Sequence, residues 1–118
     1  MSANKQIAQK WLNAFNQQDL EKLLKLYHED AAHYSPKLRV HQPASLGLIA
    51  GKPALRTWWA DAFARLPDLH YQLLQLTTED DRVFMEYIRQ TPGEDDIRVG
   101  ETLTIQDGII IASRVFHS

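Results

Sequence analysis

The sequence predicts an α+β domain in which a curved, mostly antiparallel β-sheet wraps around three helices from the N-terminal half. Before residue 67, apolar residues recur three times at the three-four spacing of a helix; after residue 68 the runs alternate as in strands. Asp107-Gly108 between two β-rich runs is the strongest short-range hairpin signal in the chain. With 118 residues, 44% of them hydrophobic, we expect residues 1–118 to form a single domain.

Two helices are expected at the N-terminus. Apolar residues from Ala3 to Phe15 form one helical stripe. Asp19 is a natural N-cap for a second helix, in which the same spacing continues from Leu20 to Tyr27. The two helices are expected to pack as a hairpin.

The middle of the chain combines a strand, a long loop and a third helix. Ala31–Ser35 reads as a short strand that Pro36 ends, because proline cannot donate to a ladder. Lys37–Ala50 has no clear period and is expected to be a long loop of the kind that often forms lids or binding segments. Gly51-Lys52-Pro53 then starts an aromatic helix that runs to Pro67.

The remainder predicts four strands in a meander. Leu69–Thr78 and Arg82–Thr91 are the first two, joined by a tight turn at Asp80-Asp81. A five-residue turn at Pro92–Asp96 leads into the final hairpin, which ends at Phe116.

The hairpin turn predicts a register for the last two strands. If Gln106 faces Ile109, one face is apolar except where a carboxylate lies across from a guanidinium. Such a buried pair is either a structural ion pair or the polar centre of a pocket. The predicted pairs are Ile105–Ile110, Leu103–Ala112, Glu101–Arg114 and Val99–Phe116. The opposite face, with Thr102, Thr104, Ile111, Ser113 and Val115, is then a plausible dimer surface.

Three further polar residues, His33, Ser35 and Tyr87, are candidates for the inner face. His33 lies two residues before Ser35, so both point to the same side of their strand. Histidine titrates near neutrality and serves as a general base, although a single strand histidine is more often structural. Tyr87 falls opposite Glu101 if Thr91 faces Ile97, whereas an odd register turns Glu86 inward; we prefer the first register because alternate residues from Val83 to Tyr87 are the more apolar set.

Aromatic residues could line an apolar ligand pocket or simply fill the core. Stripes at helical spacing are more often core. The candidates are Trp11, Phe15, Tyr27, Trp58, Trp59, Phe63 and Phe116.

Composition excludes several classes of function. The formal net charge is −2, without a block of like charges, so neither nucleic acid nor a membrane is an expected partner. The chain has no cysteine, and its five histidines, His28, His33, His41, His70 and His117, show no metal-ligand spacing, so no metal is expected. No leader or transmembrane run is visible, and we expect a cytoplasmic protein.

Several strings together resemble the SnoaL-like branch of the nuclear-transport-factor-2-like superfamily. They are Ala14–Leu20, Tyr27–Ala31, Gly51–Leu55 and Asp107–Ile110, and they span nearly the whole chain. The resemblance implies a cone of helices and a curved mixed sheet around a pocket, the cystatin-like α+β roll, and a homodimer formed through the outer sheet face. It is specific for the fold and weak for function, because this superfamily hosts isomerases, cyclases, dehydratases and non-enzymes.

The ketosteroid isomerases within this superfamily use an aspartate base, a tyrosine and a protonated aspartate. By resemblance, the tyrosine falls at Trp11, the base at Ser35 before Pro36, and the protonated acid at Glu101. Tryptophan can only donate its N–H and serine is not basic at neutral pH, so the steroid isomerase mechanism is not expected.

The expected function is that of a SnoaL-like isomerase, cyclase or dehydratase without a cofactor, acting on a small, largely apolar or amphipathic molecule. Proton transfer would involve Glu101 or His33, with Arg114 paired to Glu101. The alternative is a non-catalytic module of the same fold that binds a small ligand or dimerises.

Overall fold

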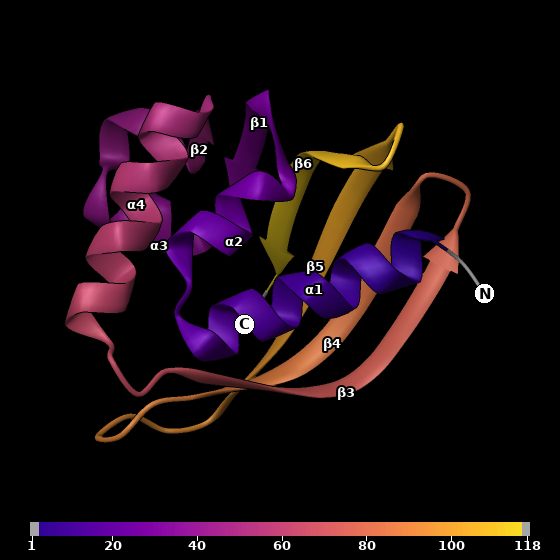
Figure 1. Ribbon diagram of the computed structural model, residues 1–118. Helices are drawn as coiled ribbons and strands as arrows, with labels where there is room; N and C mark the ends of the chain where they lie inside the picture. Colours follow the sequence, from indigo (N-terminus) through magenta and orange to yellow (C-terminus); the bar gives the residue numbers. More distant parts are fainter. Residues whose placement is uncertain (1–2, 117–118) are drawn as a thin grey trace.

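The computed structural model describes residues 3–116 and contains one six-stranded, open, curved sheet (Figure 1). The strand order is β2-β1-β6-β5-β4-β3; all neighbours are antiparallel except β1 and β6, which are parallel. The helices are α1 (Ala3–Gln17), α2 (Leu20–Lys25), α3 (Pro36–His41), α4 (Lys52–Arg65) and the 3-10 helix η1 (Pro43–Ser45). The strands are β1 (Tyr27–Tyr34), β2 (Leu48–Ala50), β3 (His70–Glu79), β4 (Arg82–Gln90), β5 (Ile97–Gln106) and β6 (Ile109–Phe116).

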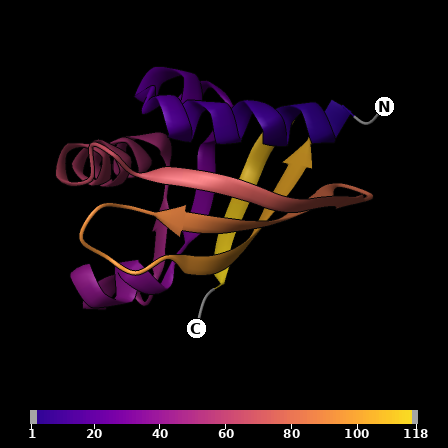
Figure 2. The same cartoon turned by 90° about the horizontal axis from the view of Figure 1, so that it is seen from below.

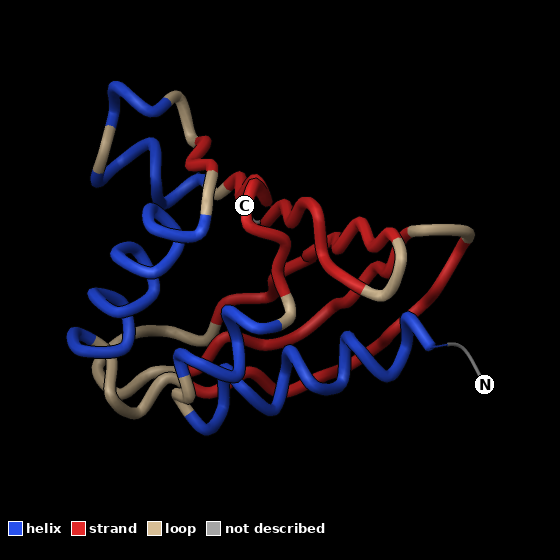
Figure 3. The backbone as a smooth tube through the Cα atoms, turned by 45° about the horizontal axis from the view of Figure 1, so that its top comes forward, coloured by secondary structure: helices blue, strands red, loops and turns tan. Residues whose placement is uncertain are grey.

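The helices lie along one side of the sheet, and its strands bend around them (Figure 3). Seen from below, α1 runs along the strands while α4 lies at one end, near the turn that joins β4 to β5 (Figure 2). The enclosed space holds the core, which includes the fully buried Trp11, Tyr27 and Met85. Within residues 3–116, no helix is long and apolar enough to cross a membrane.

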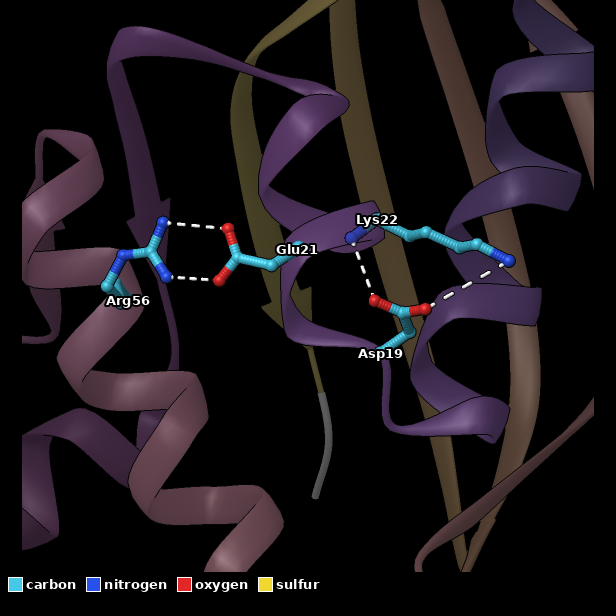
Figure 4. Close-up of polar contacts among 4 residues, drawn as sticks. All are labelled: Asp19, Glu21, Lys22 and Arg56. Atoms are coloured by element: carbon cyan, nitrogen blue, oxygen red, sulfur yellow. Dashed lines mark hydrogen bonds and ion pairs between the residues drawn. The ribbon is translucent and has the colours of Figure 1, made fainter.

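Side-chain contacts fix the short helix α2 at its start and against α4 (Figure 4). Asp19 caps α2 by accepting a hydrogen bond from the backbone N–H of Lys22 at 3.1 Å, as its position in the sequence predicts. Glu21 accepts two hydrogen bonds from the guanidinium of Arg56 on α4. A six-residue helix is marginal alone, so these contacts and the burial of Leu23 and Leu24 hold it in place.

The predicted fold class is confirmed, with differences in two segments. Lys37–Ala50 is not a loop: it contains most of α3, η1 and β2. Ser35 and Pro36, expected only to end a strand, also start α3, because the Ser35 hydroxyl accepts from the N–H of Lys37 and proline fits the first helical turn. Tyr27 belongs to β1 and not to the second helix, which ends at Lys25.

A β-bulge changes the register of the last hairpin. Asp107 and Gly108 both have positive φ, and Ile105 pairs with Ile110 as predicted. Ile111 is then an extra residue, since Thr104 pairs with Ala112. The predicted register is therefore wrong beyond this point: Val115 lies opposite Glu101, and Arg114 lies opposite Thr102.

The bulge also exchanges the two faces of β6. Ser113 and Val115, expected on the outer face, turn toward the helices and line the inner face. Ala112 and Arg114 shift the other way, because a one-residue slip moves each side chain to the opposite side of a sheet.

Asp19→Ala should destabilise the protein by about 1 kcal/mol, because the N-terminus of α2 loses its side-chain acceptor. Asp19→Asn should cost almost nothing, since asparagine caps equally well. Urea unfolding would measure both. Lys22→Ala removes only an exposed ion pair and serves as the control; a loss as large as that of Asp19→Ala would assign the effect to the ion pair.

Candidate functional site

A cavity of about 310 Å³ lies between the inner face of the sheet and the helices. Its walls combine aromatic side chains from α1 and α4 with polar side chains from the strands. Its mouth carries charged residues from α3, α4 and the 91–96 turn. The lining includes Phe15, His33, Ser35, Lys37, Trp58, Trp59, Arg65, Leu66, Leu69, Tyr71, Tyr87, Arg89, Glu94, Val99, Glu101 and Val115.

Glu101 is an acid buried in this wall without a cation beside it. Its inward position on β5 lies between Val99 and Leu103, and the residue is 1% exposed. The Tyr87 hydroxyl donates to Oε1 at 2.8 Å. The other oxygen, Oε2, is the one buried side-chain polar atom without a hydrogen-bond partner in the described part of the chain.

Burial makes Glu101 a proton donor. It raises the pKa of the carboxyl from the usual 4.5 to about 8, although the hydrogen bond from Tyr87 acts in the opposite direction. The group is therefore mostly protonated at neutral pH. Because Oε1 already accepts from Tyr87, the acidic proton belongs on Oε2, which has no partner among residues 3–116.

A stack of aromatic residues supports this acid. Tyr71 on β3 stacks on Tyr87 with ring centroids 4.3 Å apart, and Trp11 packs against both rings. Burial, followed by the neighbouring Glu101, raises the pKa of both tyrosines. Both phenols therefore stay neutral, and Tyr87 remains a hydrogen-bond donor to Glu101.

A chain of hydrogen bonds orients His33 on the adjacent strand. The indole of Trp11 donates to the Tyr27 hydroxyl at 3.0 Å, and Tyr27 donates to Ser113 at 3.0 Å. Ser113 Oγ lies 2.7 Å from His33 Nδ1. Since indole can only donate, Tyr27 donates its proton to Ser113; we assign the proton of the Ser113 hydroxyl to the bond with Nδ1, because that hydroxyl already accepts from Tyr27. This arrangement places the ring proton of His33 on Nε2.

His33 is neutral in this setting. Burial lowers the pKa of its imidazole from the usual 6.5 to about 4. With Nδ1 occupied by Ser113, Nε2 is the ring nitrogen left for a ligand in the cavity that His33 lines. The site thus offers two neutral groups, one carboxylic acid and one imidazole.

The cavity brings together some of the residues that the sequence singles out. Glu101, His33, Ser35, Phe15, Trp58, Trp59 and Tyr87 line it. Trp11, Tyr27 and Phe63 belong to the packed core and do not reach its surface. Arg114 and Phe116 line depressions on the opposite face of the sheet, because the bulge at Ile111 turns them outward.

The predicted Glu101–Arg114 pair is therefore wrong. The Arg114 guanidinium lies over the ring of Tyr34 at 4.2 Å, on the outer face. Tyr87 does reach Glu101, but not from the predicted cross-strand position: Met85 lies opposite Glu101, and Tyr87 pairs with Val99. The preference for Val83, Met85 and Tyr87 as the inward set is confirmed.

Sequence reasoning missed several polar residues of the cavity, namely Tyr71, Arg89, Lys37, His41, Arg65 and Glu94. Arg89 continues the inward alternation of Tyr87, so the pattern contained a signal for it. Tyr71 precedes a register shift in β3, and Lys37 stands on a helix that was expected to be a loop. Among the described residues, no group of three or more His, Asp or Glu could hold a metal ion; His117 lies outside those residues.

Comparison with known proteins identifies relatives of this architecture. The family described as SnoaL-like domain matches residues 8–113. A SnoaL-like protein of unknown function from Burkholderia thailandensis is 22% identical, with a TM-score of 0.85 over 98% of this chain and 94% of that one. A proposed polyketide cyclase from Sinorhizobium meliloti is 18% identical, with a TM-score of 0.79 over 98% and 100%.

A proposed ketosteroid isomerase from Kribbella flavida is 15% identical, with a TM-score of 0.80 over 98% of this chain and 78% of that one. At these identities the solved structures establish the shared fold only. The search of curated proteins found no match.

The raised pKa of Glu101 should make stability depend on pH. Between its usual pKa and about 8, the folded protein keeps a proton that the unfolded chain releases, so the free energy of unfolding falls as pH rises. Near pH 7.5, where His33 of the unfolded chain is already mostly neutral and adds little opposing slope, the loss is about 1 kcal/mol per pH unit.

Glu101→Gln should remove most of this slope, and urea unfolding at a series of pH values would measure it. Glu86→Gln, the same change on the outer face of β4, is the matched control. Parallel curves for wild type and Glu101→Gln would show that Glu101 ionises normally.

Proposed function

The chain belongs to the SnoaL-like domain family, and from this premise and the cavity we propose that it is an enzyme that activates a carbonyl group by proton donation from Glu101. The substrate is a small, largely apolar molecule, and the reaction is an isomerisation, cyclisation or dehydration. One observation supports this most strongly: a protonated carboxyl in the cavity wall whose Oε2 has no partner in the part of the chain that the structure describes.

The residues of the cavity fit catalysis that begins with proton donation by a general acid better than catalysis that begins with proton abstraction by a general base. A carbonyl oxygen that reaches Oε2 would accept a hydrogen bond, which strengthens as negative charge develops on that oxygen. Tyr87 supports this role, because its bond to Oε1 stabilises any negative charge left on the carboxyl. A donor whose pKa lies near 8 is close to the working pH, where general acids are most effective.

The groups needed for base-initiated steroid isomerisation are absent from the corresponding positions. Ser35 is engaged in capping α3, where its hydroxyl accepts from Lys37 N at 3.2 Å. Trp11 directs its N–H to Tyr27 and not into the cavity. His33 serves better as a second donor through Nε2 than as a base, because its imidazole binds a proton only near pH 4.

Deuterium exchange at the acidic carbon of β-tetralone tests this proposal. This small ketone suits the cavity and exchanges its hydrogens through an enol, which proton donation to the carbonyl accelerates. Proton NMR in D2O should show exchange above the buffer rate, and Glu101→Gln should lower the protein-dependent rate by about 10²-fold. The rate should also fall as pH rises through about 8, where Glu101 loses its proton.

Glu86→Gln is again the control, since Glu86 faces outward and pairs with Arg98. An equal rate for wild type and Glu101→Gln would contradict the proposal. Binding of β-tetralone without exchange would instead support a non-catalytic pocket protein.

We also propose that two copies associate through the outer face of the sheet. Phe84 and Phe116 are 42% and 48% exposed there, on either side of Gly100. A Cβ at Gly100 would approach the Phe84 ring to 3.1 Å, so glycine allows that ring to lie flat on the sheet. Exposed aromatic rings on the outer face of a sheet are typical of an interface.

Phe84→Asp should convert a dimer into a monomer, because it places an unpaired charge in that interface. Light scattering at micromolar protein concentration would measure the change. Val40→Asp, on the exposed face of α3, is the control and should leave the dimer intact. A monomeric wild-type protein would contradict this proposal.

A further inference from the structure

The mouth of the cavity contains a buried guanidinium with unused donors. Arg89 lies on β4 two residues after Tyr87, on the same inward face, and its side chain is 7% exposed. Its Nη1 donates to Glu94 Oε1 at 3.0 Å. That is its one hydrogen bond within the described residues, although a guanidinium has five N–H donors. Arg89 lines the cavity, so the remaining donors are available to a ligand there.

Positive charge exceeds negative charge around this guanidinium. Lys37 on α3 lines the same mouth, and burial together with the nearby Arg89 lowers the pKa of its amine. Arg65 is neutralised by Asp61, one helical turn away at 2.7 Å. Among the described residues, Glu94 is thus the single carboxylate that faces both Arg89 and Lys37. Within residues 3–116, one positive charge in the mouth is therefore left without a partner.

The position of Arg89 also indicates how a bound molecule would be oriented in the cavity. Two residues along a strand correspond to about 7 Å, so Arg89 stands about that far from Tyr87, which holds Glu101. Phe15, Trp58 and Trp59 contribute apolar wall to the same cavity. A molecule that fits has an apolar body, a carbonyl at the inner end and one negative charge at the mouth.

From this arrangement we infer that the substrates are apolar keto acids, whose carboxylate binds Arg89 with Lys37 beside it while the carbonyl faces Glu101. The inference rests on the proposed function for the role of the carbonyl. The Arg89–Glu94 bond shows that this guanidinium already accepts a carboxylate, and planar carboxylates match its fork of donors. Glu94 lies on the 91–96 turn and is 46% exposed, so a ligand carboxylate can displace it.

Benzoylpropionate and its primary amide form a matched pair of probes, since they differ mainly in one negative charge. Quenching of the fluorescence of Trp58 and Trp59, which line the cavity, would report their dissociation constants. The acid should bind at least about tenfold more tightly than the amide, as expected for one charge-assisted contact. Arg89→Met should reduce this ratio to about one.

Two further variants make the test specific. Glu94→Gln should tighten binding of the acid severalfold and leave the amide unchanged, because it removes the competing carboxylate. Arg98→Met is the matched control: Arg98 lies on β5 with its side chain 68% exposed on the outer face, and the ratio should not change. Equal binding of acid and amide, binding of neither at millimolar concentration, or an unchanged ratio in Arg89→Met would overturn the inference.

The outcome of this binding test can be distinguished from the outcome of the exchange test of the proposed function. β-Tetralone has no carboxylate, so its exchange tests Glu101 alone, whereas the ratio of affinities requires no turnover. Exchange that depends on Glu101 without a preference for the acid would overturn only the keto acid inference. A preference that depends on Arg89 without exchange would overturn only the catalytic proposal.

Discussion

The interior of this protein is arranged around a carboxyl group held in an apolar wall, with no positive charge from residues 3–116 beside it. An ionised acid at the Glu101 position would cost several kcal/mol in such surroundings, and the protein avoids that cost by keeping the group protonated. The Tyr87 hydroxyl donates to Oε1 of Glu101, and Oε2 has no hydrogen-bond partner among the described residues. Burial therefore keeps a proton on Glu101 at neutral pH, so that its carboxyl can donate a hydrogen bond. An exposed glutamate would be ionised at this pH and could only accept.

The polar network behind the cavity serves a different purpose from the acid. Trp11, Tyr27 and Ser113 are each buried, and each satisfies the next with one hydrogen bond until the chain reaches His33. A buried network in which every polar group is hydrogen-bonded makes its surroundings more rigid, whereas a buried polar atom without a hydrogen bond is energetically costly. This chain of satisfied hydrogen bonds therefore differs from Glu101, whose Oε2 has no hydrogen-bond partner among the described residues.

Local chemistry made much of the fold predictable. Helical stripes, the Asp19 cap and the turn at Asp107-Gly108 are signals carried by a few neighbouring residues, and each lies where it was expected. The family resemblance added the cone shape, and it placed a pocket acid at Glu101, a position that does line the cavity.

The site itself was only partly predictable. The run Ile109-Ile110-Ile111 has no alternation, so nothing in it reveals which isoleucine is the extra one, and the pairing of Arg114 was assigned on an ideal register. Lys37 was missed because α3 is held by tertiary contacts, including the buried Leu38, that a local pattern does not contain. Arg89 continues the alternation of inward residues along β4, but a charged residue at an inward position is not expected in an apolar core. Its position is explained only once the cavity is known.

The single extra isoleucine in β6 decides which side chain lies across from the acid. In a regular ladder of the same length, Arg114 would lie opposite Glu101 and Ser113 would turn away from His33. Glu101 would then form half of an ion pair, and the imidazole would lose its hydrogen-bond partner. Two registers of one strand, related by a slip of a single residue, thus correspond to a charged and an uncharged interior, and the bulge selects the uncharged one.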